Sequence, residues 1–192
     1  MHLSRRTVLT SIVAAAAAPR WSFAAGEQRV LIVYYSYTGH TGAVAEKLRA
    51  LLGAELFEIQ MQAPYPLDMQ RAAEQSKYEL ETGELPPLFD GLPKPSKYDL
   101  VLVGGPVWWN TITPPVMSFL ERTDFGGRKV APFATYVLEP AHYERNFAAQ
   151  ARSASLLSSL MISEFEVTEG QADKAIAAWA LRNLPKYGPQ AL

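Results

Sequence analysis

An unbroken apolar run near the start of the chain constrains the fold more than any other feature. The run covers residues 29–36, and its centre, from Val30 to Tyr35, carries no charged residue. A strand with one face in water alternates apolar and polar residues, whereas a run without alternation is typical of a strand covered on both faces. We therefore expect a central strand of a parallel sheet that has helices on both sides.

A helix and a second strand are predicted directly after this run. Gly53 stands where the helix would end, and a β-rich segment at 55–59 follows it. A strand, a helix and a strand in so few residues form a crossover unit, in which the two strands are parallel and the connection is right-handed. The apolar residues at helical spacing are Val44, Leu48, Leu51 and Leu52.

The same alternation of elements continues to the end of the chain. The later strands are predicted at 98–105, 128–135 and 160–167, and the later helices at 68–81, from 114 onward, at 142–153 and around 172–180. This pattern predicts an α/β protein with a doubly wound, open sheet of five parallel strands and helices in two outer layers. A chain of 192 residues with 48% hydrophobic residues is long enough for one such core.

The first 25 residues are interpreted as an export signal. Arg5 and Arg6 precede a short apolar run at 12–18, and small residues near Ala24 offer a cleavage point. The paired arginines resemble a twin-arginine signal, and Arg20, after the apolar run, is unusual for ordinary secretion. An ordinary secretory signal or an uncleaved anchor is the alternative. We expect a signal peptide at 1–25, one domain at 26–192, and a periplasmic protein with no stable membrane insertion after cleavage.

Composition excludes several classes of function. The chain has no cysteine, so disulfides, thiolate nucleophiles and iron–sulfur clusters are ruled out. Its 18 basic and 19 acidic side chains are nearly balanced, so we expect no binding to nucleic acid. Redox chemistry in this chain would therefore require a bound cofactor.

Hydroxyl side chains and a glycine gather in the turn between the first strand and the first helix. Backbone N–H groups at a helix N-terminus bind phosphate, and Gly39 permits the tight turn that directs them inward. The turn has no lysine and lacks the glycine spacing of a dinucleotide motif, which favours a monoester phosphate. The alternative is that the hydroxyls only cap the helix. The residues of this turn are Ser36, Tyr37, Thr38, Gly39, His40 and Thr41.

These motifs resemble the flavodoxin family. Residues 36–41 are similar to the Ser/Thr-x-Thr-Gly-x-Thr loop of that family, and residues 104–109 look like its second flavin loop, in a variant with two tryptophans. The resemblance covers residues 29–184. It implies a flavodoxin-like, three-layer fold with strand order 2-1-3-4-5, and FMN as the cofactor.

The resemblance also implies which residues contact FMN. The phosphate would lie on residues 36–41, and the flavin ring against a loop after the third strand. The two tryptophans offer flat stacking area, although core packing is the alternative for them. Tyr136 either stacks on the other face of the ring or covers the sheet, and the segment 135–143 lacks the glycines common in the family's third loop. The residues of the second loop are Pro106, Val107, Trp108, Trp109, Asn110 and Thr111.

Three functions fit these expectations. They are an electron carrier with a partner protein, a reductase that uses a nicotinamide cofactor and a quinone, and a flavin-binding module without turnover. No residue is assigned a catalytic role, because His40 and His142 are interpreted as ordinary loop and helix residues, and no spacing indicates a metal site. The acids of the helix at 68–81 and its end are expected to be solvated. These acids are Glu74, Glu79, Glu81 and Glu84.

Overall fold

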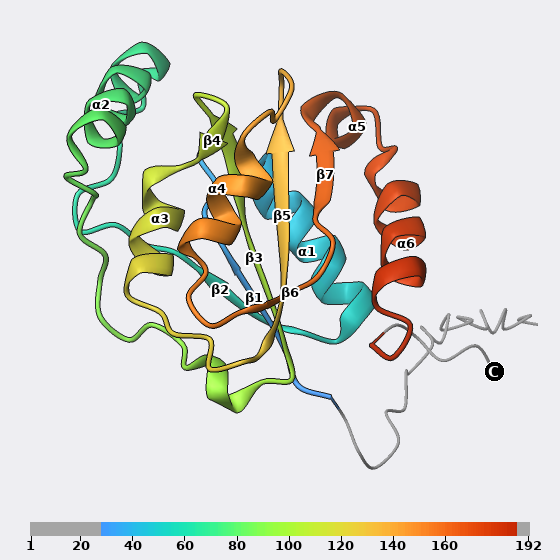
Figure 1. Cartoon of the computed structure of the whole chain (residues 1–192). Helices are drawn as coiled ribbons and strands as arrows, with labels where there is room; N and C mark the ends of the chain where they lie inside the picture. Colours follow the sequence, from blue (N-terminus) through green and yellow to red (C-terminus); the bar gives the residue numbers. More distant parts are fainter. Residues whose placement is uncertain (1–27, 188–192) are drawn as a thin grey trace, which may run out of the picture.

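A mainly parallel sheet with helices on both faces forms the body of the molecule (Figure 1). The computed structural model describes residues 28–187, so the expected signal peptide lies outside the described residues. Within this part of the chain the sheet has seven strands. They are β1 (Val30–Tyr34), β2 (Glu55–Glu58), β3 (Leu100–Trp108), β4 (Thr111–Ile112), β5 (Lys129–Tyr136), β6 (Ser155–Leu156) and β7 (Leu160–Ser163).

The strand order confirms the predicted topology. The order is β2-β1-β3-β5-β6, and all neighbours on this path are parallel. Two short strands share the fifth position, since β6 pairs with the start of β5 and β7 with its end. The sheet is thus the five-position arrangement 2-1-3-4-5, with β4 added as a short antiparallel arm on β3.

Six helices in the described residues form the two outer layers. Helices α1, α5 and α6 cover one face of the sheet, and α2, α3 and α4 lie on the other, with α2 at the outer end beyond α3 (Figure 1). The helices are α1 (His40–Leu52), α2 (Met69–Thr82), α3 (Pro114–Glu121), α4 (Tyr143–Gln150), α5 (Glu164–Thr168) and α6 (Ala172–Asn183), and a single 3-10 turn spans Pro95–Lys97. No helix within residues 28–187 is long and apolar enough to cross a membrane.

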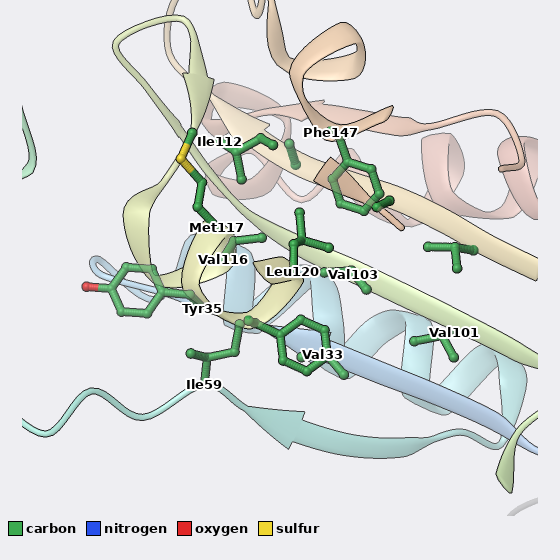
Figure 2. Close-up of a cluster of buried hydrophobic side chains, with 14 of the residues drawn as sticks. Val33, Tyr35, Ile59, Val101, Val103, Ile112, Val116, Met117, Leu120 and Phe147 are labelled. Atoms are coloured by element: carbon green, nitrogen blue, oxygen red, sulfur yellow. The ribbon is translucent and has the colours of Figure 1, made fainter. Parts of the chain in front are cut away.

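The central strands bury side chains on both faces, as the unbroken apolar run predicts. In β1, Ile32 packs toward α1 and α6, and Val33 packs toward the opposite layer. Figure 2 shows this second cluster, which includes Val103 of β3, Leu120 of α3 and Phe147 of α4. Because all five side chains are almost fully buried, the sheet forms a rigid platform for the loops at its edge.

Two strand ends differ from the sequence prediction by three residues or more. The last strand ends at Ser163, and the predicted strand residues 164–167 belong to α5. The reason is a capping box: the Ser163 side chain accepts a hydrogen bond from the Glu166 N–H, and the Glu166 carboxylate accepts one from the Ser163 N–H. In addition, β3 does not end at residue 105 but continues to Trp108, because β4 pairs with its last residues.

A close contact between β3 and β5 gives a stability prediction. A Cβ atom on Gly104 would lie 2.5 Å from the ring of Phe133, which is fully buried. We expect Gly104→Ala to lower the free energy of unfolding by about 1–3 kcal/mol through overpacking, measured by urea denaturation. Gly42→Ala is the control, since its Cβ would make only ordinary contacts of 3.5 Å and alanine favours a helix. Equal stability of both variants would contradict the prediction.

Candidate functional site

The carboxyl ends of β1, β3 and β5 meet at one edge of the sheet. The chain leaves β1 toward β2 on one side, while β3 lies on the other side of β1. Ligands of open α/β sheets bind in the crevice formed at such a reversal of strand order. The turn at residues 35–39 and the end of β3, which carry the predicted site residues, both lie at this edge.

The turn between β1 and α1 has the geometry of an anion site. Gly39 has φ +93° and directly precedes α1, and a Cβ atom there would have nothing within 4 Å. Within residues 28–187, the backbone N–H groups of residues 37–41 have no hydrogen-bond acceptor. Several N–H groups at the positive end of a 13-residue helix favour an anion of phosphate size.

The hydroxyl groups of the turn have different environments. Ser36 Oγ accepts the Gly42 N–H, in the first turn of α1, at 3.1 Å. Thr38 is exposed, and its hydroxyl lies 3.2 Å from Nδ1 of His40. Thr41 is buried and shares a hydrogen bond of 2.7 Å with the hydroxyl of Thr135 on β5. Among these three hydroxyls, Thr38 is therefore the one best placed to donate to a ligand.

The buried hydroxyl pair gives a second stability prediction. Thr41→Val leaves the Thr135 hydroxyl buried without its partner, so we expect the free energy of unfolding of the flavin-free protein to fall by about 1–3 kcal/mol. In the double variant Thr41→Val, Thr135→Val, neither hydroxyl remains, and the loss should be smaller than the sum of the two single losses. Urea denaturation of all four proteins measures this difference, and strictly additive losses would argue against the pair.

A histidine and a carboxylate stand beside the turn. His40 Nδ1 lies 3.2 Å from Oε2 of Glu164, the first residue of α5. The Glu164 carboxylate would repel a phosphate bound at the turn. The sequence interpretation of His40 as an ordinary loop residue did not anticipate this contact. His142, in contrast, is exposed and directly precedes α4, as predicted.

Three aromatic rings lie together next to the turn. The ring centroids of Tyr37 and Trp108 are 5.3 Å apart in an edge-to-face arrangement, and those of Tyr65 and Trp108 are 5.4 Å apart. The Tyr37 hydroxyl donates to the carbonyl of Pro66 at 2.6 Å. The half-buried Trp108 therefore lies beside the turn, in contact with Tyr37 of that turn.

The predicted second loop is a β-hairpin, and it separates the two tryptophans. Trp108 pairs with Thr111, so Trp109 and Asn110 form a two-residue turn, with φ values of +53° and +60°. Asparagine tolerates positive φ well, whereas tryptophan there is uncommon. Trp109 leans away from Trp108 onto α2, where its Nε1–H donates to Ser76 Oγ at 3.1 Å. The structure thus brings Trp108, but not Trp109, to the aromatic cluster beside the turn.

Other residues of the hairpin hold it in place. Pro106 pairs with Thr135 in the β3–β5 ladder, and Val107 pairs with Ile112 of β4. The Thr111 hydroxyl accepts from the Asn146 amide at 2.7 Å. The Asn110 carbonyl accepts the His142 N–H at 3.1 Å, so the hairpin is tied to the segment after β5.

Tyr136 lies at the same edge of the sheet but has no contact that decides its role. It is the last residue of β5, is half-buried, and pairs with Ser163 of β7. The segment after it contains no glycine, and Val137 and Leu138 are largely exposed. Both expectations for Tyr136, stacking on a ring or covering the sheet, stay predictions.

Sequence reasoning missed the role of α2 at the site. Glu79 was expected in water, but it is only 5% exposed and accepts hydrogen bonds from the Tyr65 hydroxyl and from the Gln75 amide, the latter at 2.9 Å. Burial raises the pKa of the Tyr65 phenol, and the bond to Glu79 raises this pKa further, so Tyr65 stays a donor. A signal for this packing was present, because α2 has too few large apolar residues for an apolar buried face.

A cleft opens between α2, α3 and α4, next to the hairpin. Its volume is about 660 Å³, which is within the range of small-molecule sites. Leu80 and Met117 contribute apolar wall, and Glu79, Glu121 and Arg152 contribute charge. Within residues 28–187, no cluster of three or more potential metal-ligating residues is present.

Comparisons with known proteins agree with the fold. A family model described as Flavodoxin matches residues 29–174. A putative flavoprotein from Bacteroides eggerthii is 26% identical, with a TM-score of 0.67 over 81% of this chain and 97% of that one. A putative flavoprotein from Bacteroides uniformis is 27% identical, with a TM-score of 0.60 over 74% and 97% of the two chains. A flavoprotein in complex with FMN from Lactobacillus acidophilus is 23% identical, with a TM-score of 0.64 over 74% and 97%.

Proposed function

Because the chain belongs to the flavodoxin family, we propose that it binds FMN and works as a redox protein. Bound FMN supplies the chemistry, since its ring system takes up and releases electrons. The observation that carries the proposal is the turn at Gly39, where the N–H groups of residues 37–41 have no acceptor within residues 28–187. A monoester phosphate is the part of FMN that fits such a turn.

Different groups of the turn contribute to phosphate binding in different ways. The backbone N–H groups from Tyr37 to Thr41 donate hydrogen bonds, and the N-terminus of α1 adds its positive field. Thr38 adds a hydroxyl donor from the exposed side. The bond from Gly42 to Ser36 keeps the turn in shape before the ligand arrives, which lowers the entropy lost on binding.

The flavin ring is expected to lie against Trp108. This indole is half-buried and packs against the rings of Tyr37 and Tyr65, so it offers an ordered apolar surface. Trp109 contributes to this surface only through the backbone of the hairpin, because its own ring rests on α2. The absence of glycine at 136–142 predicts that backbone contacts from that segment to the ring are few.

A comparison of FMN with riboflavin tests this proposal directly. Riboflavin has the same ring but no phosphate, so it cannot use the turn. We expect the purified full-length protein to be yellow or to bind added FMN, with a dissociation constant about 100-fold lower than that for riboflavin. Quenching of flavin fluorescence measures both constants. A colourless protein that binds neither flavin would overturn the proposal. Equal affinities for FMN and riboflavin would mean that the turn does not bind the phosphate.

The cleft beside the hairpin supports a reductase role alongside the carrier role. A carrier needs only an exposed ring edge, whereas a reductase needs space for a small acceptor, and the cleft of about 660 Å³ offers such space close to Thr111. Oxidation of NADH or NADPH by the FMN-loaded protein, with a soluble quinone and no partner protein, tests this role. Steady turnover would establish a reductase, and reduction only by an added redox protein would establish a carrier.

Export by the twin-arginine route is part of the proposal. It is supported by Arg5 and Arg6 before the apolar run, and by the cofactor, because FMN bound to the folded state has to be loaded before export. Replacing both arginines with lysine should leave the precursor in the cytoplasm, as measured by cell fractionation and immunoblotting. A variant that still reached the periplasm would exclude this route.

A further inference from the structure

The buried face of α2 is unusual because it is mostly polar. Its buried residues are Ala72, Ser76 and Glu79, whereas the apolar Met69 and Tyr78 of the same helix are more than half exposed. Burying a carboxylate next to neutral donors costs stability, and an apolar side chain in its place would avoid this cost. The buried polar residues of α2 therefore call for an explanation other than packing.

Both polar residues on this face hold aromatic residues at the candidate site. Ser76 Oγ accepts the indole N–H of Trp109 at 3.1 Å. Glu79 accepts the Tyr65 hydroxyl, and the ring of Tyr65 lies 5.4 Å from that of Trp108. One helix, which otherwise has few contacts with the sheet, is thus connected to both indoles of the hairpin.

The environment of Glu79 explains how its orientation is set. The Gln75 amide donates to Oε1 at 2.9 Å, and the Tyr65 hydroxyl donates to Oε2, so each carboxylate oxygen has its own donor. The other charged groups that face the same cleft are Glu121 and Arg152, and the Arg152 guanidinium donates to the Glu121 carbonyl oxygen at 2.7 Å. Glu79 therefore acts through its two hydrogen bonds and holds the Tyr65 ring at a fixed angle.

We propose that Glu79 is a positioning residue for the flavin: it fixes the Tyr65 phenol, and through the Tyr65 ring it fixes the Trp108 indole against which the flavin lies. The inference rests on the proposed function, since it assumes that Trp108 contacts FMN. Its structural part, the link from Glu79 to Trp108, is independent of any ligand.

Flavin affinity tests the functional part of this proposal. Glu79→Ala leaves the Tyr65 hydroxyl buried without an acceptor, so we expect the dissociation constant for FMN to rise about tenfold. Tyr65→Phe should raise the dissociation constant by a similar factor. The double variant should bind FMN as well as Tyr65→Phe alone, because both changes break the same hydrogen bond between Tyr65 and Glu79. Glu74→Gln, an exposed acid on the same helix, is the control and should leave the constant unchanged. Additive effects in the double variant would overturn the proposal.

Fluorine NMR of the flavin-free protein tests the structural part. With 5-fluorotryptophan in the full chain, each indole gives its own resonance, assigned by single Trp→Phe replacements. We expect Glu79→Ala and Tyr65→Phe to shift the Trp108 resonance, while Trp179, buried on α6 at the other face, stays unmoved. Glu79→Gln keeps an oxygen acceptor for Tyr65 and should restore the Trp108 resonance toward that of the wild type.

The two measurements separate this proposal from the proposed function. An unmoved Trp108 resonance in both Glu79→Ala and Tyr65→Phe would overturn the positioning role, even if the wild type binds FMN tightly. A wild type that binds no FMN would overturn the proposed function, and with it the role toward the flavin, while the fluorine spectra would still report whether Glu79 orders Trp108. Circular dichroism of each variant confirms that it folds.

Discussion

Replacing Gly39 with valine should raise the dissociation constant for FMN by about two orders of magnitude. Gly39 has φ +93°, a backbone conformation that a β-branched residue adopts only with strain of about 1–2 kcal/mol. Space is not the obstacle, since a Cβ atom there would have nothing within 4 Å. The turn would relax toward negative φ and direct its N–H groups away from the phosphate. Each N–H group that turns away removes a charge-assisted hydrogen bond. Titration of flavin fluorescence measures the change.

Gly91→Val is the matched control for this experiment. Gly91 has φ +90° and equally open surroundings, but it lies in the connection between α2 and β3, away from the turn. Both variants should lose a similar free energy of unfolding, and only Gly39→Val should lose affinity for FMN. If Gly91→Val weakened FMN binding as much, general destabilisation would account for the loss and the turn would not be the phosphate site.

Trp108→Ala should raise the dissociation constant for FMN about 30-fold, whereas Trp109→Ala should change it about threefold or less. The difference follows from the hairpin, which places Trp108 among the rings beside the turn and Trp109 on α2. Loss of one aromatic stacking partner for a flat ring costs about 1–3 kcal/mol. The fluorescence of bound FMN should also increase in Trp108→Ala, because the adjacent indole no longer quenches it. Equilibrium titration and steady-state emission measure both effects.

Trp108→Phe provides the control for lost volume, since it keeps an aromatic ring and should retain most of the affinity. The opposite ranking, with Trp109 the more important of the two, would mean that the indole on α2 turns toward the ring when FMN binds. In that case the hairpin would have to change its conformation, and the hydrogen bond from Trp109 to Ser76 would break.

The doubly wound parallel sheet could be predicted because it depends on local patterns, whereas the strand order was implied by the resemblance to the flavodoxin family. The apolar runs of β1 and β3 have no alternation, and this alone indicates strands covered on both faces. The crossover from β1 through α1 to β2 fixes parallel pairing. The strand end at Ser163 was missed although the capping box with Glu166 can be read from sequence, because the apolar residues around it suggested a longer strand.

The glycine turn at the start of α1 could be predicted because its residues are contiguous, and its role in binding phosphate stays a prediction. The aromatic part of the site could not, since it depends on where α2 packs. The few large apolar residues of α2 indicate a polar buried face, but they do not indicate that Glu79 lies on it rather than the exposed Glu74 or Glu81. Their different burial is decided by Tyr65, which reaches α2 from a separate connection, and by the hairpin turn at Trp109. Such contacts between distant segments are tertiary, and no local period signals them.

The two edges of the sheet affect how readily this protein aggregates. One edge strand, β2, has four residues with a glutamate at each end, and the opposite edge consists of the separate short strands β6 and β7. Neither edge offers a long, flat, uncharged row of backbone groups to which another chain could add a strand. Folded molecules at high concentration would therefore resist edge-to-edge aggregation.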